Sequence, residues 1–189
     1  QEIFKKIEHL PKEEKKEIKE SIVQLTNTSF GTKNESSVIN LYKIETKNDV
    51  VLLNDYYTIN LFNSLNYNYY LGGKVDGITS DKSTIIEVKN RVNRLFNTIK
   101  DYENVQIHAY MKILNINKVH LIECLKNDQC KYNILPTSYN EDFFNKEIMD
   151  NFIKFIDFFE RFLVDDDLKI KIYTQDKKTL EKFLKKEIY

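Results

Sequence analysis

The sequence predicts an α/β protein that folds as one domain. Its 189 residues suffice for a single domain with a sizeable core. Short stretches rich in β-branched residues alternate with longer stretches in which apolar residues recur every three or four positions, a pattern typical of mixed strands and helices. Three of the four glycines lie between residues 72 and 77, where we expect the backbone to turn or to approach another group closely.

Charge and cysteine content limit the classes of function. The 29 basic and 29 acidic residues cancel, so no overall field attracts nucleic acid and any such binding must be local. Cys124 and Cys130 are too few for a four-cysteine metal site, and we expect both to be reduced, in the cytoplasm or another reducing intracellular compartment. No apolar run reaches the ~18–20 residues of a membrane span. Because the chain begins with Gln1 rather than Met, a removed leader stays an alternative.

The N-terminal part is predicted to be helical. Residues 2–25 fit one or two helices, with Pro11 as a break or a first-turn residue. A further helix is predicted to open near residues 28–35 and to run to about residue 45, with Glu35 at the head of an apolar face of Val38, Ile39 and Tyr42. The spacing of Thr32 and Glu35 also fits a capping box, so a structural role for this carboxylate competes with a functional one.

The rest of the chain outside the glycine-rich stretch reads as alternating strands and helices. Strands are predicted over residues 50–54, 58–63, 67–71, 118–125 and 131–135, the last ending at Pro136. Helices are predicted over residues 101–114 and 141–164, followed by a short strand and a Lys-rich helix. The second helix carries a predicted core face of Phe144, Ile148, Phe152, Phe155, Phe159 and Phe162. Tyr67, Tyr69 and Tyr70 are expected in the core rather than on a base-stacking surface.

The stretch from Gly72 to Lys89 predicts a β-hairpin that brings charged groups together. If the turn closes on residues 81–82, residues whose numbers sum to 163 face each other, which places Asp76 opposite Glu87. Their Cβ atoms would then be roughly 5 Å apart. Side chains alternate along a strand, so Glu87 and Lys89 share one face.

Two carboxylates at this distance need a compensating positive charge. Lys89 is one candidate, a divalent cation held by oxygen ligands is another, and an ordinary charged surface hairpin is the third interpretation. Arg91 and Arg94 follow directly. They could act as phosphate-binding forks or as solvated loop charges.

The ordered motifs resemble those of the PD-(D/E)XK nuclease superfamily. Gln106 and Tyr110 are four residues apart on the helix at 101–114 and so share a face. With them, the set Gly31-x-x-x-Glu35, Gly73-x-x-Asp76-Gly77 and Glu87-Val88-Lys89 is similar to the branch of phage-lambda-type exonucleases and YqaJ-like recombinases, which is related to RecB-type nuclease domains. The resemblance covers about residues 31–125.

The resemblance implies a fold and a role for each matching residue. It implies a restriction-endonuclease-like core, an α/β fold with a central mixed sheet of four or five strands flanked by helices. Asp76, Glu87 and Glu35, with the Val88 carbonyl, would bind Mg²⁺ or Mn²⁺, and Lys89 would orient the attacking water and stabilise charge on phosphorus. Gln106 would hold Lys89 or the phosphate. Tyr110 would support that helix beside the substrate, where Arg91 and Arg94 are the candidate phosphate ligands.

The implied function is metal-dependent hydrolysis of phosphodiester bonds in DNA, by an exonuclease of the recombination or repair type. The alternatives are an endonuclease acting on DNA or RNA, and a catalytically silent nucleic-acid-binding or scaffold domain that kept the fold. We expect one nuclease domain over residues 1–189, with helical elaborations at residues 1–26 and 140–189. The expected partner is DNA, with RNA as the alternative, and no membrane.

Overall fold

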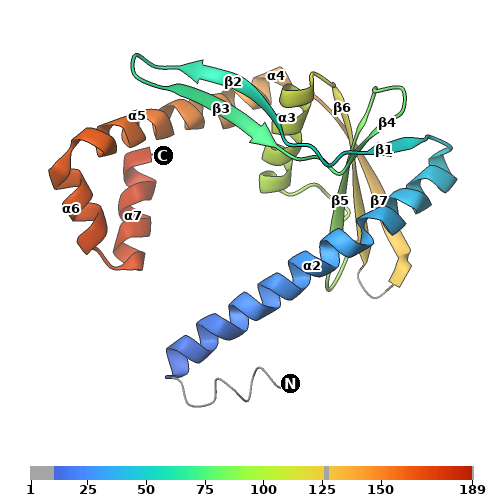
Figure 1. The fold of residues 1–189 in the computed structure, drawn as a ribbon, viewed down its shortest axis with the longest axis horizontal. Coiled ribbons are helices and arrows are strands. Elements are labelled where there is room, and N and C mark those ends of the chain that lie inside the picture. The colour runs from blue at the N-terminus through green and yellow to red at the C-terminus, as the bar shows by residue number, and fades with distance from the viewer. Residues whose placement is uncertain (1–10, 126–127, 189) are drawn as a thin grey trace.

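The central element of the fold is a five-stranded mixed sheet. The structure, a computed structural model, describes residues 11–125 and 128–188. The strands are β1 (Val50–Leu52), β4 (Gly77–Thr79), β5 (Ile85–Arg91), β6 (Lys118–Leu125) and β7 (Asp128–Ser138), in the order β1-β4-β5-β6-β7 (Figure 1). β5 and β6 run parallel, and the other neighbours are antiparallel. The predicted α/β fold with a mixed central sheet is confirmed.

Helices cover both faces of this sheet. Helix α2 (Lys12–Thr46) packs its last turns on one face, and α3 (Asp101–Leu114) packs on the other. On the α2 side the buried residues are Val38, Ile39, Tyr42, Val50, Ile86, Val88, Ile122 and Cys124. On the α3 side they are Val75, Ile85, Ile107, Met111, Val119 and Leu121. Alternate residues of β5 therefore point to opposite helices, which fixes the face that each of its charged side chains occupies.

Helix α2 joins what were predicted as separate helices, over residues 2–25 and from near residues 28–35 to about residue 45. Its backbone is helical without interruption from Lys12 to Thr46, and Pro11 is the N-cap. Residues 2–10 of the predicted N-terminal helix lie outside the described part of the chain. One glycine inside a helix costs only about 1 kcal/mol relative to alanine, which a long run of good helix formers can absorb. The first turns of the helix project away from the sheet (Figure 1).

Strands β2 (Tyr57–Asn63) and β3 (Asn68–Gly73) form a separate antiparallel arm beside α3 (Figure 1). The ring of Tyr69 contacts Phe152 edge-on, with the ring centroids 6.1 Å apart, and its hydroxyl donates to Glu160 at 2.8 Å. Tyr69 thus faces the protein as expected. The same expectation is wrong for Tyr67 and Tyr70, which are 45% and 62% exposed.

Strand β7 continues past its predicted end at Pro136 and reaches Ser138. Pro136 is paired with His120 of β6. β7 is the outermost strand of the sheet, and a proline at such an edge leaves no ladder hydrogen bond unmade on its open side.

The C-terminal segment is entirely helical in its described part. It comprises α4 (Glu141–Phe143), a π-helix η1 (Phe144–Met149), α5 (Asp150–Val164), α6 (Asp166–Thr174) and α7 (Lys177–Ile188). In the predicted core face Phe144 and Ile148 are buried and Phe152, Phe159 and Phe162 are half-buried, but Phe155 is 44% exposed, and Ile156 and Phe158 are buried beyond the wide turn of η1. The predicted strand is helix α6 instead, because Asp165 caps its N-terminus by accepting from Leu168 N–H at 2.9 Å.

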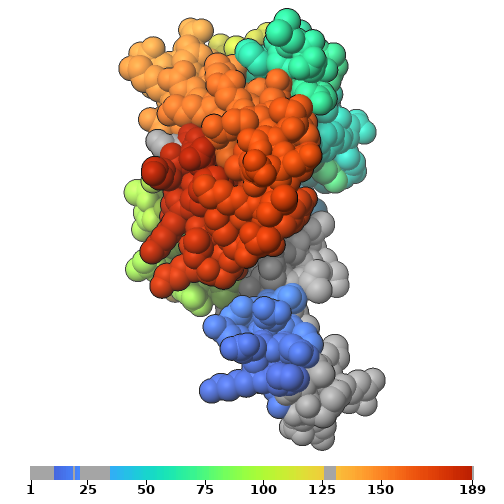
Figure 2. Space-filling view, turned by 90° about the vertical axis from the view of Figure 1, so that its left-hand side faces the viewer, coloured from blue at the N-terminus to red at the C-terminus, as the bar shows by residue number. Residues whose placement is uncertain are grey.

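Helices α5, α6 and α7 pack together around a small core of Phe158, Leu168 and Ile188. They cover much of the face shown in Figure 2, with the first turns of α2 below them. Within the described residues, no helix combines the length and the apolar character needed to cross a bilayer.

Candidate active site

The hairpin of β4 and β5 has the register that the sequence predicts. Gly77 pairs with Ile86 and Ile78 with Ile85, so the numbers of paired residues sum to 163. The turn contains Lys82 at φ 59° and is held by Asp81, whose Oδ1 accepts from Thr79 Oγ1 at 2.6 Å. This register places Glu87 and Lys89 side by side on the face of the sheet that α3 covers.

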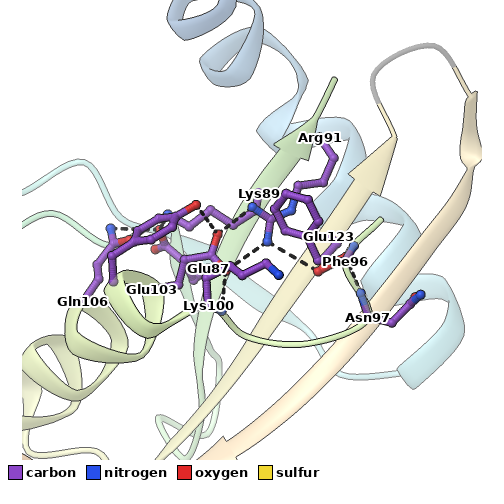
Figure 3. A network of polar contacts seen from close by, with 10 residues as sticks. Glu87, Lys89, Arg91, Phe96, Asn97, Lys100, Glu103, Gln106 and Glu123 are labelled. Atoms are coloured by element: carbon purple, nitrogen blue, oxygen red, sulfur yellow. Dashed lines mark hydrogen bonds and ion pairs between the residues drawn. The ribbon is translucent and has the colours of Figure 1, made fainter. Parts of the chain in front are cut away.

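Four side chains from β5 and α3 form one hydrogen-bonded network (Figure 3). Lys89 Nζ donates to Glu87 Oε1 at 2.8 Å and to Gln106 Oε1 at 2.7 Å. The amide nitrogen of Gln106 donates to Tyr110 Oη at 2.8 Å and to Glu87 Oε1 at 3.2 Å. The ammonium of Lys89 therefore has a fixed position, and its contact with Gln106 is one of the two that the resemblance implies for this glutamine.

Gly73 explains how Tyr110 reaches this network. A Cβ atom on residue 73 would lie 2.5 Å from Cε1 of Tyr110, far inside van der Waals contact. Only glycine lets the end of β3 run against the tyrosine ring. The ring in turn holds its hydroxyl beside Gln106.

Asp76 and Glu35 lie next to the network. Asp76 Oδ2 accepts from the backbone N–H of Val88 at 2.7 Å, which ties the residue before β4 to β5. Asp76 also lines a pocket of about 190 Å³ with Glu35 and Lys74, together with Ser36, Leu52, Leu53 and Asn54. Glu35 lies in the interior of helix α2, so it cannot cap a helix there, and the capping-box interpretation is wrong.

Burial raises the pKa of all three carboxyl groups, and the charge of Asp76 adds to the rise for Glu87 and Glu35. Burial raises the pKa of Glu87 to about 7, and the charge of Asp76 adds to the rise, against the opposing charge of Lys89. Burial also raises the pKa of Asp76, and burial followed by the charge of Asp76 raises that of Glu35. Glu87 Oε2 is buried and has no hydrogen-bond partner among the described residues. The site therefore has more negative charge than Lys89 alone compensates.

The chemistry of these donors fits a divalent cation. Hard cations such as Mg²⁺ and Mn²⁺ take carboxylate and carbonyl oxygens, and the buried Glu87 Oε2 atom is such an oxygen without a partner. Across residues 11–125 and 128–188, no three acidic, histidine or cysteine side chains already stand together as ligands of one ion. One oxygen of Glu87 is engaged by Lys89 instead.

Arg91 takes a different role from the predicted one. Its guanidinium donates to both oxygens of Glu103, at 2.5 and 3.0 Å, and to Glu123 Oε1 at 3.4 Å, and it lies 4.4 Å from the centroid of the Phe96 ring (Figure 3). Arg91 is only 8% exposed. These contacts contradict the expected phosphate contact of Arg91. Arg94, by contrast, is exposed.

The ion cluster of Arg91, Glu103 and Glu123 holds α3 and the preceding loop against β5 and β6. Glu123 Oε2 accepts from the backbone N–H of Phe96 at 2.7 Å, and Glu103 Oε2 accepts from that of Lys100 at 3.1 Å. Burial alone would raise the pKa of Glu103, but the hydrogen bonds and charge of Arg91, together with the hydrogen bonds from the Lys100 N–H and the Tyr102 hydroxyl, hold that pKa below its ordinary value. Because Glu103 lies one turn before Gln106, the cluster sets where Gln106 meets Lys89.

Sequence reasoning missed Glu103, Glu123 and Lys74. Glu123 is a carboxylate inside the apolar strand β6, which is the same signal that singled out Glu87. Glu103 lies three residues before Gln106 and therefore on the same side of α3. Lys74 offered no signal, because a single lysine in a loop is usually solvated.

The role of Glu35 can be tested by the Glu35→Gln variant. The amide keeps the size of the side chain and removes a charge that burial and Asp76 disfavour, so we expect unchanged or slightly higher thermal stability. A neutral amide binds a hard cation poorly, so we expect a large loss of Mn²⁺-dependent cleavage. A melting curve and a digestion assay on one preparation give both results. Full activity in a stable variant would remove Glu35 from the site.

The pKa of Glu87 predicts how stability depends on pH without metal. Between about pH 4.5, the ordinary value, and about pH 7, the folded protein keeps a proton that the unfolded chain loses, so the free energy of unfolding falls as the pH rises. Glu87→Gln removes this effect. The free energy of unfolding is measured with urea in EDTA. At pH 8 it should be higher for the variant than for the parent by on the order of 1–3 kcal/mol, and at pH 5 this difference should be much smaller.

The exposed Glu45 provides the control for this measurement, because Glu45→Gln changes the same group where it is solvated. That variant keeps Glu87, so its free energy of unfolding should follow that of the parent at both pH values. A Glu87→Gln protein that is less stable than the parent at pH 8 would show that Glu87 is not held at a raised pKa.

No protein-family model matches the chain, and no curated protein matches it in sequence. Among solved structures, the chain is similar in fold to the alkaline exonuclease LHK-Exo from Laribacter hongkongensis, with 18% identity, a TM-score of 0.48, and coverage of 64% of this chain and 62% of that one. It is also similar to a phage-related exonuclease from Haemophilus somnus 129PT, with 12% identity, a TM-score of 0.48, and coverage of 64% and 65%. The chain thus spans less than two thirds of each of these exonucleases.

Proposed function

We propose that this chain is a metal-dependent nuclease of the PD-(D/E)XK type, which hydrolyses phosphodiester bonds in DNA. The observation that carries the proposal is the network of Glu87, Lys89 and Gln106 next to the carboxylates of Asp76 and Glu35. An exonuclease of the recombination or repair type is favoured because the sequence motifs resemble the lambda-type branch. The proposed substrate is DNA.

The carboxylates have the role of holding the cation. Asp76, Glu87 and Glu35, with the Val88 carbonyl, would bind Mg²⁺ or Mn²⁺. When bound, the ion supplies a water of lowered pKa and neutralises charge on the phosphoryl oxygens. The raised pKa values of the three carboxyl groups fit this role, since a bound divalent cation compensates the charge of carboxylates that burial disfavours.

Lys89 has the role of stabilising negative charge on the phosphorus under attack. Its ammonium is held between Glu87 and Gln106 rather than in bulk water, and its side chain is only 21% exposed. A fixed positive charge in a partly dry site costs little reorganisation when the new bond from water oxygen to phosphorus forms and the ester bond breaks. Gln106 positions Lys89, and Tyr110 positions Gln106.

A digestion of linear and closed circular DNA, with and without Mn²⁺, tests this function. Loss of linear DNA alone, only with Mn²⁺, supports the exonuclease. Nicking of closed circles would show that the protein is an endonuclease. DNA binding without any cleavage would show that it is the catalytically silent module.

A further inference from the structure

The outer face of the β2–β3 arm is exposed and uncharged. Neither strand contains a charged residue, although 31% of the whole chain is charged. Side chains alternate along the arm: the inner set, which includes Ile59, Tyr69 and Leu71, is half-buried against the protein. The outer set is exposed and consists of Thr58, Asn60, Asn68 and Tyr70, with Tyr56 just before β2.

Tyr56 and Tyr70 present aromatic rings on this outer face. Tyr56 is 69% and Tyr70 62% exposed. The ring of Tyr56 lies over Gly72, because a Cβ atom on residue 72 would be 2.6 Å from the Tyr56 hydroxyl oxygen and 2.8 Å from its Cε1 atom. The ring therefore packs closely on the glycine and is otherwise largely exposed. Two open aromatic rings on one short uncharged face are a surface on which planar groups can stack.

This face leads directly to the proposed active site. Tyr70 and Gly72 alternate on β3, which ends at Gly73, and the next residue, Lys74, shares a pocket with Glu35 and Asp76. An extended chain rises about 3.3 Å per residue, so Tyr70 lies at most roughly 20 Å from Asp76. A single strand of a few nucleotides can span that distance. Along the chain, the aromatic ring of Tyr70 is thus followed by the exposed ammonium of Lys74 and then by the carboxylate of Asp76.

We propose that Tyr56 and Tyr70 stack on the bases of a single-stranded nucleic acid whose backbone passes Lys74 on its way to Asp76. The inference rests on the proposed nuclease function and adds its substrate class: an unpaired strand, or the opened end of a duplex. Bases within a duplex already stack on each other and offer no free face, whereas unpaired bases stack on exposed aromatic side chains. The lack of carboxylates on the arm suits a polyanion, and Lys74 supplies a phosphate contact next to the site.

Binding measured without cleavage tests this stacking face. The probe is a short fluorescein-labelled oligothymidylate, and its Kd is read by fluorescence anisotropy in EDTA. Tyr70→Ala and Tyr56→Ala should each raise this Kd by roughly 5- to 50-fold, the range expected when one base loses its stacking partner. Tyr70→Phe keeps the ring and should bind like the parent. A blunt duplex of the same length should show little change in Kd in every variant.

Two further variants separate stacking from damage to the fold. Gly72→Ala keeps both tyrosines but displaces the Tyr56 ring, so it should also weaken binding of the single strand. Tyr173→Ala is the matched control, because Tyr173 on α6 is 79% exposed and lies outside the arm. Each variant should keep the melting temperature of the parent.

Equal Kd values for the single strand in the parent, Tyr70→Ala and Tyr56→Ala would overturn the proposal, and a protein partner would then be the better explanation of the exposed face. An equal rise in Kd for the single strand and for the duplex would also overturn it. The proposed function fails separately, if the parent cuts no DNA with Mn²⁺. That result would not alter the binding ratios, which are measured in EDTA.

Discussion

Replacing Lys89 with alanine is expected to slow Mn²⁺-dependent DNA cleavage by roughly 10²–10³-fold, the loss typical of removing one charge-stabilising contact from a dry site. The ammonium is held by Glu87 and Gln106 at 2.8 and 2.7 Å, so the parent site needs little rearrangement to use it. Lys89→Arg should lose most activity as well, because a planar guanidinium cannot place its charge at the same point. Initial rates at saturating Mn²⁺ measure the effect.

Lys82 provides the control for this variant. It lies exposed in the turn of the same hairpin, so Lys82→Ala should cut like the parent. Lys89→Ala should still bind DNA, since its role lies in the chemical step. If Lys89→Ala cuts as fast as the parent, the nuclease function of this hairpin is wrong and the silent module becomes the better explanation.

Replacing Arg91 with alanine is expected to lower the free energy of unfolding by about 3–5 kcal/mol, because it leaves two buried carboxylates without their cation. Glu103 and Glu123 are both 0% exposed. For a protein of this size the melting temperature should fall by on the order of 10 °C. The loss should be larger at pH 8 than at pH 5, because without Arg91 the burial of Glu103 raises its pKa, and a buried carboxylate is destabilising only when ionised.

Arg94→Ala is the matched control, since Arg94 is an exposed arginine three residues away. It should leave the melting temperature unchanged. If Arg91→Ala has the same melting temperature as the parent, the ion cluster does not hold α3 in place. Arg91 would then again be a candidate phosphate ligand.

The parts of the site that depend on local pattern were predictable from the sequence. The period of two along a strand and a short turn determine the hairpin register, so Glu87 and Lys89 could be placed on one face. The helix at residues 101–114 was predicted with its observed bounds, and the spacing of Gln106 and Tyr110 placed them together.

Features that depend on distant contacts were not predictable in this way. The fate of Arg91 depends on Glu103 and Glu123, which lie 12 and 32 residues further along the chain. The continuity of α2 through Gly31 is a balance between one unfavourable residue and a long helix. The π-helix η1 interrupts the α-helical repeat, and beyond it the predicted face holds for Phe152, Phe159 and Phe162 but not for Phe155.

The most direct test of metal-dependent cleavage at this site is the release of acid-soluble nucleotides from linear DNA as Mn²⁺ is added to metal-free protein. The parent should release none in EDTA, and its rate should rise with Mn²⁺ to saturation. Asp76→Asn can still accept the Val88 N–H but lacks the charge that a hard cation requires, so it should release none over the same range. Release by the parent in EDTA, or equal release by Asp76→Asn, would contradict a metal site at Asp76.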